Sequence, residues 1–333
     1  MMKHTLSRAV WTALGLLFVA ATAPVSTAHA QDAAARSAGA VVVTGASSGI
    51  GRRITERLAA RGLTVFAGAR KQADLDALNA LENVIAVRLD VTVQTEIDAA
   101  VDTVEASGQR LLGIVNNAGV ANVGPLIEIE EADIDFLFDV NVYGPYRVTK
   151  AFSPRLIDDK GRVVNISSIS GILSGSLFGV YSMSKHALEA YTDSLAAEMG
   201  RFGVTVVAVE PGNYSSAIGR NMLDRMRADG RTWSESAYAD DIERMVSVFS
   251  NYEESGDWNP EPDDVAAAVE DALLSSAPKA HYMVVPVQDQ AEITIKKAIE
   301  ELVRYNEGQR FTYSRDELVQ MLDEELTRSA DGE

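Results

Sequence analysis

Residues 44–51 read Thr44-Gly45-Ala46-Ser47-Ser48-Gly49-Ile50-Gly51. This segment is the strongest indication of the fold, because it joins a strand-like run to a helical one. The run before it, residues 40–44, is short, apolar and rich in β-branched side chains, which is typical of a buried strand. The run after it, residues 50–61, has helical periodicity and stops at Gly62. A glycine turn in this position lets the backbone approach a pyrophosphate, and the free N–H groups at the helix start face the phosphates.

A glycine-rich turn can also be purely structural, and three residues separate the first two glycines here, unlike in Gly-x-Gly-x-x-Gly. Its place between the first strand and the first helix favours dinucleotide binding. We therefore expect the cofactor to contact Gly45, Ser47, Ser48, Gly49, Ile50 and Gly51.

Beyond this unit, β-branched runs continue to alternate with longer helical stretches. Further strands are predicted over residues 63–69, 84–91, 111–115, 162–167, 204–209 and 282–287. Helices are predicted over residues 72–81, 95–107, 132–157 and 180–201. Strands separated by helical crossovers form a parallel sheet covered on both faces. The pattern predicts an α/β fold, a doubly wound parallel seven-stranded sheet in a three-layer α/β/α sandwich.

Two regions lie outside this alternation. Residues 213–262 are rich in charge, methionine and aromatics, and they follow the sixth strand. Ligands of doubly wound folds bind beyond the carboxyl ends of the strands, so we expect a substrate lid here, with a helical pair that merely packs on the domain as the alternative. Residues 289–333 form a helical C-terminal extension whose apolar stripe favours packing or an oligomer surface over chemistry. The main domain then spans residues 40–288.

The composition excludes several classes of partner. The 333 residues include 48 acidic and 30 basic side chains, and the formal net charge of −18 repels nucleic acid and anionic lipid. Cysteine is absent, which excludes disulfides, thiolate metal sites and a cysteine nucleophile. The four histidines are scattered along the sequence without metal-ligand spacing, so we expect no metal.

The N-terminus resembles an export leader. Lys3 and Arg8 precede an apolar run over residues 9–23, and Ala28-His29-Ala30 offers small residues for a signal peptidase. We expect residues 1–30 to be a signal peptide of an exported, periplasmic protein and residues 31–39 a linker. An uncleaved membrane anchor or a cytoplasmic protein is the alternative. Folding around a nicotinamide cofactor before export needs a twin-arginine signal, yet Arg8 stands alone.

The end of the second strand indicates which cofactor is bound. An acidic residue there would bind the ribose 2′-hydroxyl of NAD, whereas arginine accepts the 2′-phosphate of NADP. The chain has Arg70 and Lys71, with no acid before Asp74, which favours NADP over NAD; solvated loop charges are the alternative. Asp90 ends the third strand, where it can bind the adenine, act as a loop acid or cap the next helix.

A tyrosine and a lysine four residues apart begin a helix after a glycine-rich loop. Tyr181 and Lys185 share one helical face, so the lysine charge would lower the pKa of the phenol toward a range useful for acid/base work. Such a pair alone is a common coincidence. Its neighbours favour a site, because Ser168 follows the fifth strand and Asn117 and Gly119 follow the fourth, with Asn141 in the next helix.

Together these motifs resemble the short-chain dehydrogenase/reductase family. The matching elements are residues 44–51, Asn116–Gly119, Asn141, Ser168, Tyr181-x-x-x-Lys185 and Pro211-Gly212. They occur in the family's order, and the resemblance covers residues 40–287, a Rossmann fold. It is greatest to single-domain members that act on hydroxysteroids, retinoids and similar alcohols.

The resemblance implies a role for each matching residue. Tyr181 would exchange a proton with the substrate oxygen, and Lys185 would bind the nicotinamide ribose and depress the tyrosine pKa. Ser168 would orient the substrate oxygen, and Asn141 would hold a proton-relaying water.

The remaining motifs would contact the cofactor. Asn117 and Gly119 would support the sheet beside it, and Pro211-Gly212 would lie beside the nicotinamide carboxamide. Family members often carry a threonine just beyond this Pro-Gly, whereas here Ser215 or Ser216 stands nearby.

The sequence thus predicts an NADP(H)-dependent oxidoreductase for the alcohol or carbonyl group of a small to medium apolar substrate. Analogy with the family predicts a homo-oligomer. Two alternatives are a non-catalytic NADP-binding sensor or scaffold, which would have no need of Ser168, Tyr181 and Lys185 together, and an epimerase or dehydratase of the same fold.

Overall fold

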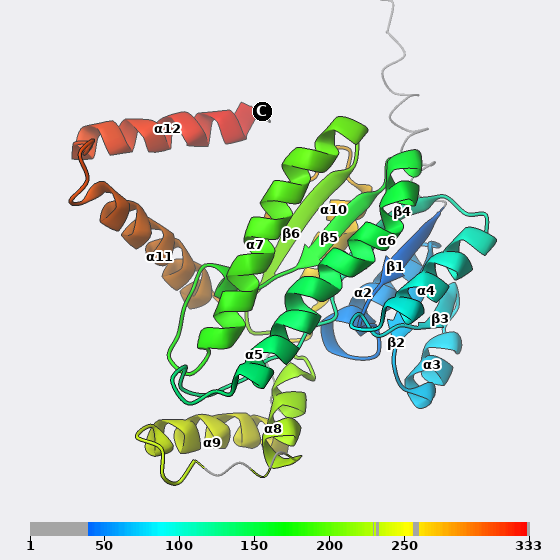
Figure 1. Cartoon of the computed structure of the whole chain (residues 1–333). Coiled ribbons are helices and arrows are strands. Elements are labelled where there is room, and N and C mark those ends of the chain that lie inside the picture. The colour runs from blue at the N-terminus through cyan, green and yellow to red at the C-terminus, as the bar shows by residue number, and fades with distance from the viewer. Residues whose placement is uncertain (1–38, 229, 231–232, 256–259, 332–333) are drawn as a thin grey trace, which may run out of the picture.

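A seven-stranded, wholly parallel sheet forms the centre of the molecule, in the order β3-β2-β1-β4-β5-β6-β7 (Figure 1). The computed structural model describes residues 39–228, 230, 233–255 and 260–331. The strands are β1 (Ala40–Val43), β2 (Thr64–Ala69), β3 (Val84–Arg88), β4 (Leu111–Asn116), β5 (Arg162–Ile166), β6 (Thr205–Pro211) and β7 (His281–Val284). The predicted doubly wound α/β sandwich is confirmed.

Each face of the sheet is covered by its own helices and its own apolar core. One core joins the sheet to α2 (Gly49–Ala60), α3 (Gln72–Asn79) and α10 (Asp263–Leu274). The other joins it to α4 (Gln94–Ala106), α6 (Gly144–Asp159) and α7 (Gly179–Met199). The strands between these layers are buried on both faces, as their unbroken apolar runs require.

Two strands end three residues earlier than the sequence predicts, and β1 and β5 end one residue earlier. β3 stops at Arg88 instead of residue 91, because Asp90 folds back to accept hydrogen bonds from Thr92. β7 stops at Val284 instead of residue 287, and Pro286, which follows, lacks the N–H that a further rung of the ladder needs. Both turns lie at the carboxyl edge of the sheet.

The long helix predicted over residues 132–157 is interrupted. It consists of α5 (Glu131–Phe138), a π-helical turn (Asp139–Tyr143) and α6. Within that turn, Asn141 hydrogen-bonds both the N–H and the C=O of Val120. π-helical turns are rare and frequently mark functional sites.

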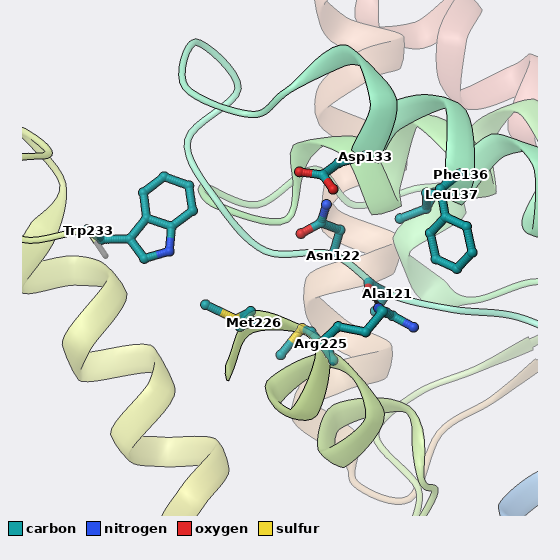
Figure 2. Close-up of a pocket in the computed structure, with 9 residues that line it drawn as sticks. Ala121, Asn122, Asp133, Phe136, Leu137, Arg225, Met226 and Trp233 are labelled. Atoms are coloured by element: carbon teal, nitrogen blue, oxygen red, sulfur yellow. Dashed lines mark hydrogen bonds between the residues drawn. The ribbon is translucent and has the colours of Figure 1, made fainter. Parts of the chain in front are cut away.

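The predicted lid contains two helices, α8 (Ile218–Ala228) and α9 (Ala239–Ser255), which lie beyond the main body in Figure 1. They share an apolar cluster with Ala121, Val123 and Leu177 of the domain. Figure 2 shows Arg225 of α8 directed toward Ala121 and Phe136; its guanidinium donates to the Ala121 carbonyl and lies 5.4 Å from the Phe136 ring centroid. A small cavity of about 50 Å³ remains between this contact and Trp233. These contacts hold α8 against the segment that follows β4.

The C-terminal extension consists of α11 (Gln288–Asn306) and α12 (Arg315–Asp331), which project from the body as an arm (Figure 1). Ile295, Ile299 and Leu302 of its apolar stripe remain about half exposed, so packing within the chain covers only part of that stripe. Among the described residues, no helix is both long and apolar enough to cross a membrane. The predicted leader (1–30) and nearly all of the linker (31–39) lie outside the described residues, and so does Trp258 of the lid.

Candidate active site

A cavity of about 550 Å³ opens at the carboxyl edge of the sheet. This volume lies within the range of small-molecule and cofactor sites. All but one of the predicted site residues line it, namely Gly45, Ser47, Ser48, Gly49, Ile50, Gly51, Arg70, Asp90, Asn117, Gly119, Ser168, Tyr181, Lys185, Pro211 and Gly212. Segments that are far apart in the sequence therefore form one site.

The backbone of the glycine turn adopts conformations and close approaches that a side chain would not permit. Gly45 and Gly49 have φ angles of 64° and 52°, in the left-handed region that favours glycine. A Cβ at Gly51 would overlap the Gly45 carbonyl and the side-chain amide of Asn117. That amide donates to the carbonyls of Thr44 and Gly45, at 3.0 Å each. Asn117 thus holds the turn in shape, and the cradle fits an anionic dinucleotide.

At the second-strand end of the cavity, Arg70 and Asp90 lie together. Arg70 Nη1 is 3.6 Å from Asp90 Oδ2. Burial opposes ionisation of Asp90, but hydrogen bonds from Thr92 and the charge of Arg70 outweigh it and hold the pKa of Asp90 below its usual value. Asp90 therefore acts as a turn-stabilising loop acid that also faces the cavity, and it keeps Arg70 at the rim.

Tyr181 and Lys185 lie one turn apart near the start of α7. Lys185 Nζ lies 5.7 Å from the Tyr181 ring centroid and donates to the Ile166 carbonyl at 2.9 Å. Burial raises the pKa of Tyr181 to about 12, and a hydrogen bond with the Ser168 side chain opposes this rise. The prediction that Lys185 lowers this pKa is wrong for the chain by itself, because desolvation dominates.

Lys185 is also perturbed by its surroundings. Burial lowers the pKa of Lys185 to about 8, although the charge of Glu189 acts in the opposite direction. A lysine with such a pKa exchanges protons near neutral pH. Ser168, whose Oγ also accepts from the Ser170 N–H at 3.0 Å, is the hydrogen-bond partner of Tyr181.

Asn141 does not line the cavity but lies directly behind it. Its Oδ1 accepts from the Val120 N–H at 2.8 Å, and its Nδ2 donates to the Val120 carbonyl and to Ser184 Oγ at 2.9 and 3.0 Å. Gly119 lies between Asn141 and the cavity, since a Cβ there would be 3.5 Å from Asn141 Oδ1 and 4.0 Å from Lys185 Nζ. Asn141 ties the segment after β4 to α7; the water-holding role stays a prediction.

The Pro-Gly turn after β6 meets a residue that sequence reasoning missed. Gln290 of α11 lines the cavity, and its Oε1 accepts from the Asn213 N–H at 2.9 Å. A Cβ at Gly212 would overlap that oxygen. Of the two serines beyond this turn, Ser216 lines the cavity, whereas Ser215 does not and donates its N–H to Pro260.

An apolar wall completes the cavity. Met222 and Phe249 come from the predicted lid, and Leu173 and Phe178 from the loop before α7. The Phe178 and Phe249 rings lie 6.1 Å apart and tilted, a favourable aromatic arrangement. Sequence alone gives no signal for the two loop residues, because an apolar side chain in a loop lines a cavity only once distant segments pack around it.

Comparison with known proteins finds clear relatives. The family described as short chain dehydrogenase matches residues 39–227. A relative named NADPH-dependent 3-dehydrocapnine reductase, from Ornithobacterium rhinotracheale, is 32% identical over 257 residues, covering 74% of this chain and 87% of the relative. The mitochondrial D-beta-hydroxybutyrate dehydrogenase of Rattus norvegicus is 31% identical, covering 76% of this chain and 79% of the relative.

Solved structures are similar to this one over most of its length. A short-chain dehydrogenase from Streptomyces avermitilis is 31% identical with a TM-score of 0.66, covering 83% of this chain and 98% of that one. An actinorhodin polyketide ketoreductase with NADPH is 28% identical with a TM-score of 0.61, covering 75% of this chain and 96% of that one.

Proposed function

The chain belongs to the short-chain dehydrogenase family, an oxidoreductase family that acts on CH–OH groups with NAD(P), and from that premise we propose a specific reaction for it. It transfers a hydride between NADP(H) and the alcohol or carbonyl carbon of a small to medium apolar substrate. The observation that carries this proposal is the meeting of Ser168, Tyr181 and Lys185 in the cavity that the glycine turn also lines.

Three side chains take part in the proton transfer. In reduction, the Tyr181 hydroxyl gives its proton to the substrate oxygen, and Ser168 holds that oxygen in place. Lys185 supplies positive charge that stabilises the resulting phenolate and returns a proton to it. The nicotinamide supplies or accepts the hydride when bound, and the protein contributes position and a proton.

The raised pKa of Tyr181 fits a role as proton donor. A phenol whose pKa burial raises to about 12 stays protonated at neutral pH, and is therefore ready to donate in the reductive direction. Oxidation needs the phenolate, so it should depend more steeply on alkaline pH than reduction does.

Arg70 supports NADP as the cofactor. It lies at the cavity rim beside Asp90, where the adenosine ribose would bind, and guanidinium pairs well with phosphate. The reductase relative is named as NADPH-dependent, and the ketoreductase structure contains NADPH.

Replacing Arg70 by alanine should weaken NADPH binding about tenfold and leave NADH binding unchanged, because only the 2′-phosphate loses a partner. Titration of the dihydronicotinamide fluorescence with each cofactor measures both dissociation constants. Arg88→Ala is the matched control, since Arg88 is an exposed arginine at the end of the neighbouring strand β3 that pairs with Glu96 and does not line the cavity. Equal weakening for both cofactors would contradict the NADP assignment.

The apolar wall of Met222, Phe249, Leu173 and Phe178 favours an apolar substrate, and we propose that α8 and α9 cover it. A screen of ketones, aldehydes, steroids and retinoids, followed by NADPH absorbance, tests this. kcat/KM should rise with apolar size across the series; preference for small charged substrates would contradict it.

For the ends of the chain we propose a cleaved export signal over residues 1–30, supported by its basic start, apolar run and small residues before Gln31. N-terminal sequencing of the protein purified from the native cell fraction should begin at Gln31. A start at Met1 would contradict cleavage.

We also propose that the protein is a homo-oligomer. The half-exposed apolar stripe of α11 supports this proposal, because a second copy of the chain could cover it.

A further inference from the structure

A cluster of titratable side chains lies on the far side of Lys185 from the cavity. His281, at the start of β7, places Nδ1 2.7 Å from Glu210 Oε1 of β6. The same Nδ1 is 3.6 Å from Glu189 Oε2 of α7. His281 Nε2 is 2.9 Å from Asp193 Oδ1, also on α7. The fold thus brings His281, which stands apart from the other histidines in the sequence, together with three carboxylates.

The cluster extends from the helical turn after Lys185 to solvent. Glu189 follows Lys185 by one helical turn on the same face of α7. Along the series, Lys185 is 6% exposed, and the side chains of Glu189, His281 and Asp193 are 15%, 42% and 65% exposed. Exposure therefore rises at each step from the buried amine to the surface carboxylate.

Glu189 is held firmly in this position. It packs on the turn that follows Ser168, where a Cβ at Gly171 would lie 2.7 Å from Glu189 Cγ. Its Oε1 is buried, and the Ser167 hydroxyl at the carboxyl end of β5 interacts with this carboxyl and opposes the rise in its pKa.

We propose that Glu189 is a positioning residue for Lys185 and that it exchanges protons between Lys185 and solvent through His281 and Asp193. This inference rests on the proposed function, in which Lys185 returns a proton to Tyr181 at each turnover. Because it leaves the site toward β7, the path is separate from Asn141, which lies on the β4 side.

The protons balance without a further reactant. In reduction, Lys185 gives one proton toward Tyr181 and regains one from the carboxyl of Glu189. Glu189 takes its proton from the His281 imidazolium, and the half-exposed ring is reprotonated by water beside Asp193. One proton enters from solvent for each proton that the substrate oxygen receives, and oxidation runs the same transfers outward.

The charge states of the cluster permit these transfers near neutral pH. Burial, with a smaller contribution from the charge of Glu210, raises the pKa of Glu189 to about 7, while Ser167, His281 and Lys185 act in the opposite direction. The hydrogen bond to Glu210 raises the pKa of His281 to about 9, against the effect of burial. The charged groups around Glu189 are Lys185 on its own helix, Glu210 on β6 and His281 on β7. Their proton affinities span only a small range, as a relay requires.

A metal centre is the other arrangement that these side chains could form. The ligand-type atoms of Glu189, Glu210 and His281 lie within 4.8 Å of one another. However, both nitrogens of His281 already face carboxylate oxygens at hydrogen-bond distance, which is the arrangement of a protonated ring and not of a metal ligand. The cluster is therefore better suited to carrying protons.

The test compares the pH dependence of reduction in Glu189→Gln and in the parent enzyme. The Glu189 carboxylate stabilises the Lys185 ammonium, so its removal should let Lys185 lose its proton at lower pH. We expect the alkaline limb of the kcat profile to move down by about one pH unit. The kinetic solvent isotope effect should increase, while the dissociation constant of NADPH stays the same.

Two further variants separate the relay from structural damage. Asp193→Asn, at an exposed position, should raise the solvent isotope effect to a smaller extent without loss of melting temperature. Glu198→Gln, an exposed change farther along α7, is the control that should leave both readouts unchanged. Should Glu189→Gln fail to fold, Asp193→Asn and His281→Gln carry the test.

An unshifted pH profile and an unchanged solvent isotope effect in folded Glu189→Gln would overturn the relay. A shift of the pH profile or a change of the solvent isotope effect when EDTA is added to the parent enzyme would instead indicate a bound metal. That result would also overturn the relay. Tyr181→Phe reports separately on the proposed function, because that variant should lose turnover whether or not the relay exists.

Discussion

Tyr181→Phe is expected to lower kcat by about a thousandfold while NADPH binds as before. The change removes one oxygen atom and keeps the ring, so the ring's packing and its position over Lys185 are preserved. What disappears is the proton that the substrate oxygen must receive, together with the hydrogen bond to Ser168. Without a donor, the developing alkoxide has no neutralising partner in a partly desolvated cavity.

Single-turnover mixing of the loaded enzyme with a substrate found in the screen measures this loss directly, and fluorescence titration measures cofactor affinity. Tyr191→Phe is the matched control, because Tyr191 lies on the same helix but does not line the cavity. Turnover within about tenfold of the parent in Tyr181→Phe would assign the proton to another group. Unchanged turnover would contradict the mechanism altogether.

Gly51→Ala should weaken cofactor binding by about tenfold to a hundredfold and lower stability by about 1–3 kcal/mol. The added methyl group would overlap the Gly45 carbonyl and the Asn117 amide. One of those atoms is backbone and the other is held by two hydrogen bonds to the turn, so neither can move without opening the turn.

Thermal unfolding with and without NADPH gives both quantities for this variant. Gly200→Ala is the control, since a Cβ there meets nothing within 4 Å and Gly200 lies away from the cavity. A Gly51→Ala protein with the parent's melting temperature and NADPH affinity would show that the turn tolerates the methyl group and does not bind the phosphates closely.

The sequence predicts well those features that depend on local chain conformation. The glycine turn, the alternation of strands and helices and the spacing from Ser168 to Lys185 all follow from residues near one another in the chain. Parallel strands then bring their carboxyl ends to one edge, so the topology gathers these motifs without further information. This is why the predicted site residues, apart from Asn141, line one cavity.

Features that depend on side chains from distant segments were not predicted. Gln290 meets Asn213 across 77 residues, and His281 meets Glu210 across 71. The π-helical turn contains Asn141, whose side chain bonds Val120, 21 residues before it. The pKa of Tyr181 was predicted in the wrong direction for a related reason: desolvation is a property of the assembled surroundings, which a tyrosine–lysine spacing does not reveal.

The contact of Gln290 with the Pro-Gly turn has a thermodynamic consequence for the C-terminal arm. Gln290 lies in the first turn of α11, so the wall of the cofactor cavity and the root of the arm are the same residues. Linkage then applies in both directions. A restraint on the arm that altered the contact between Gln290 and Asn213 would change the affinity for cofactor by a definite factor, and cofactor binding would favour the restrained orientation by the same factor. The half-exposed apolar stripe of α11 would then report on occupancy of the cavity.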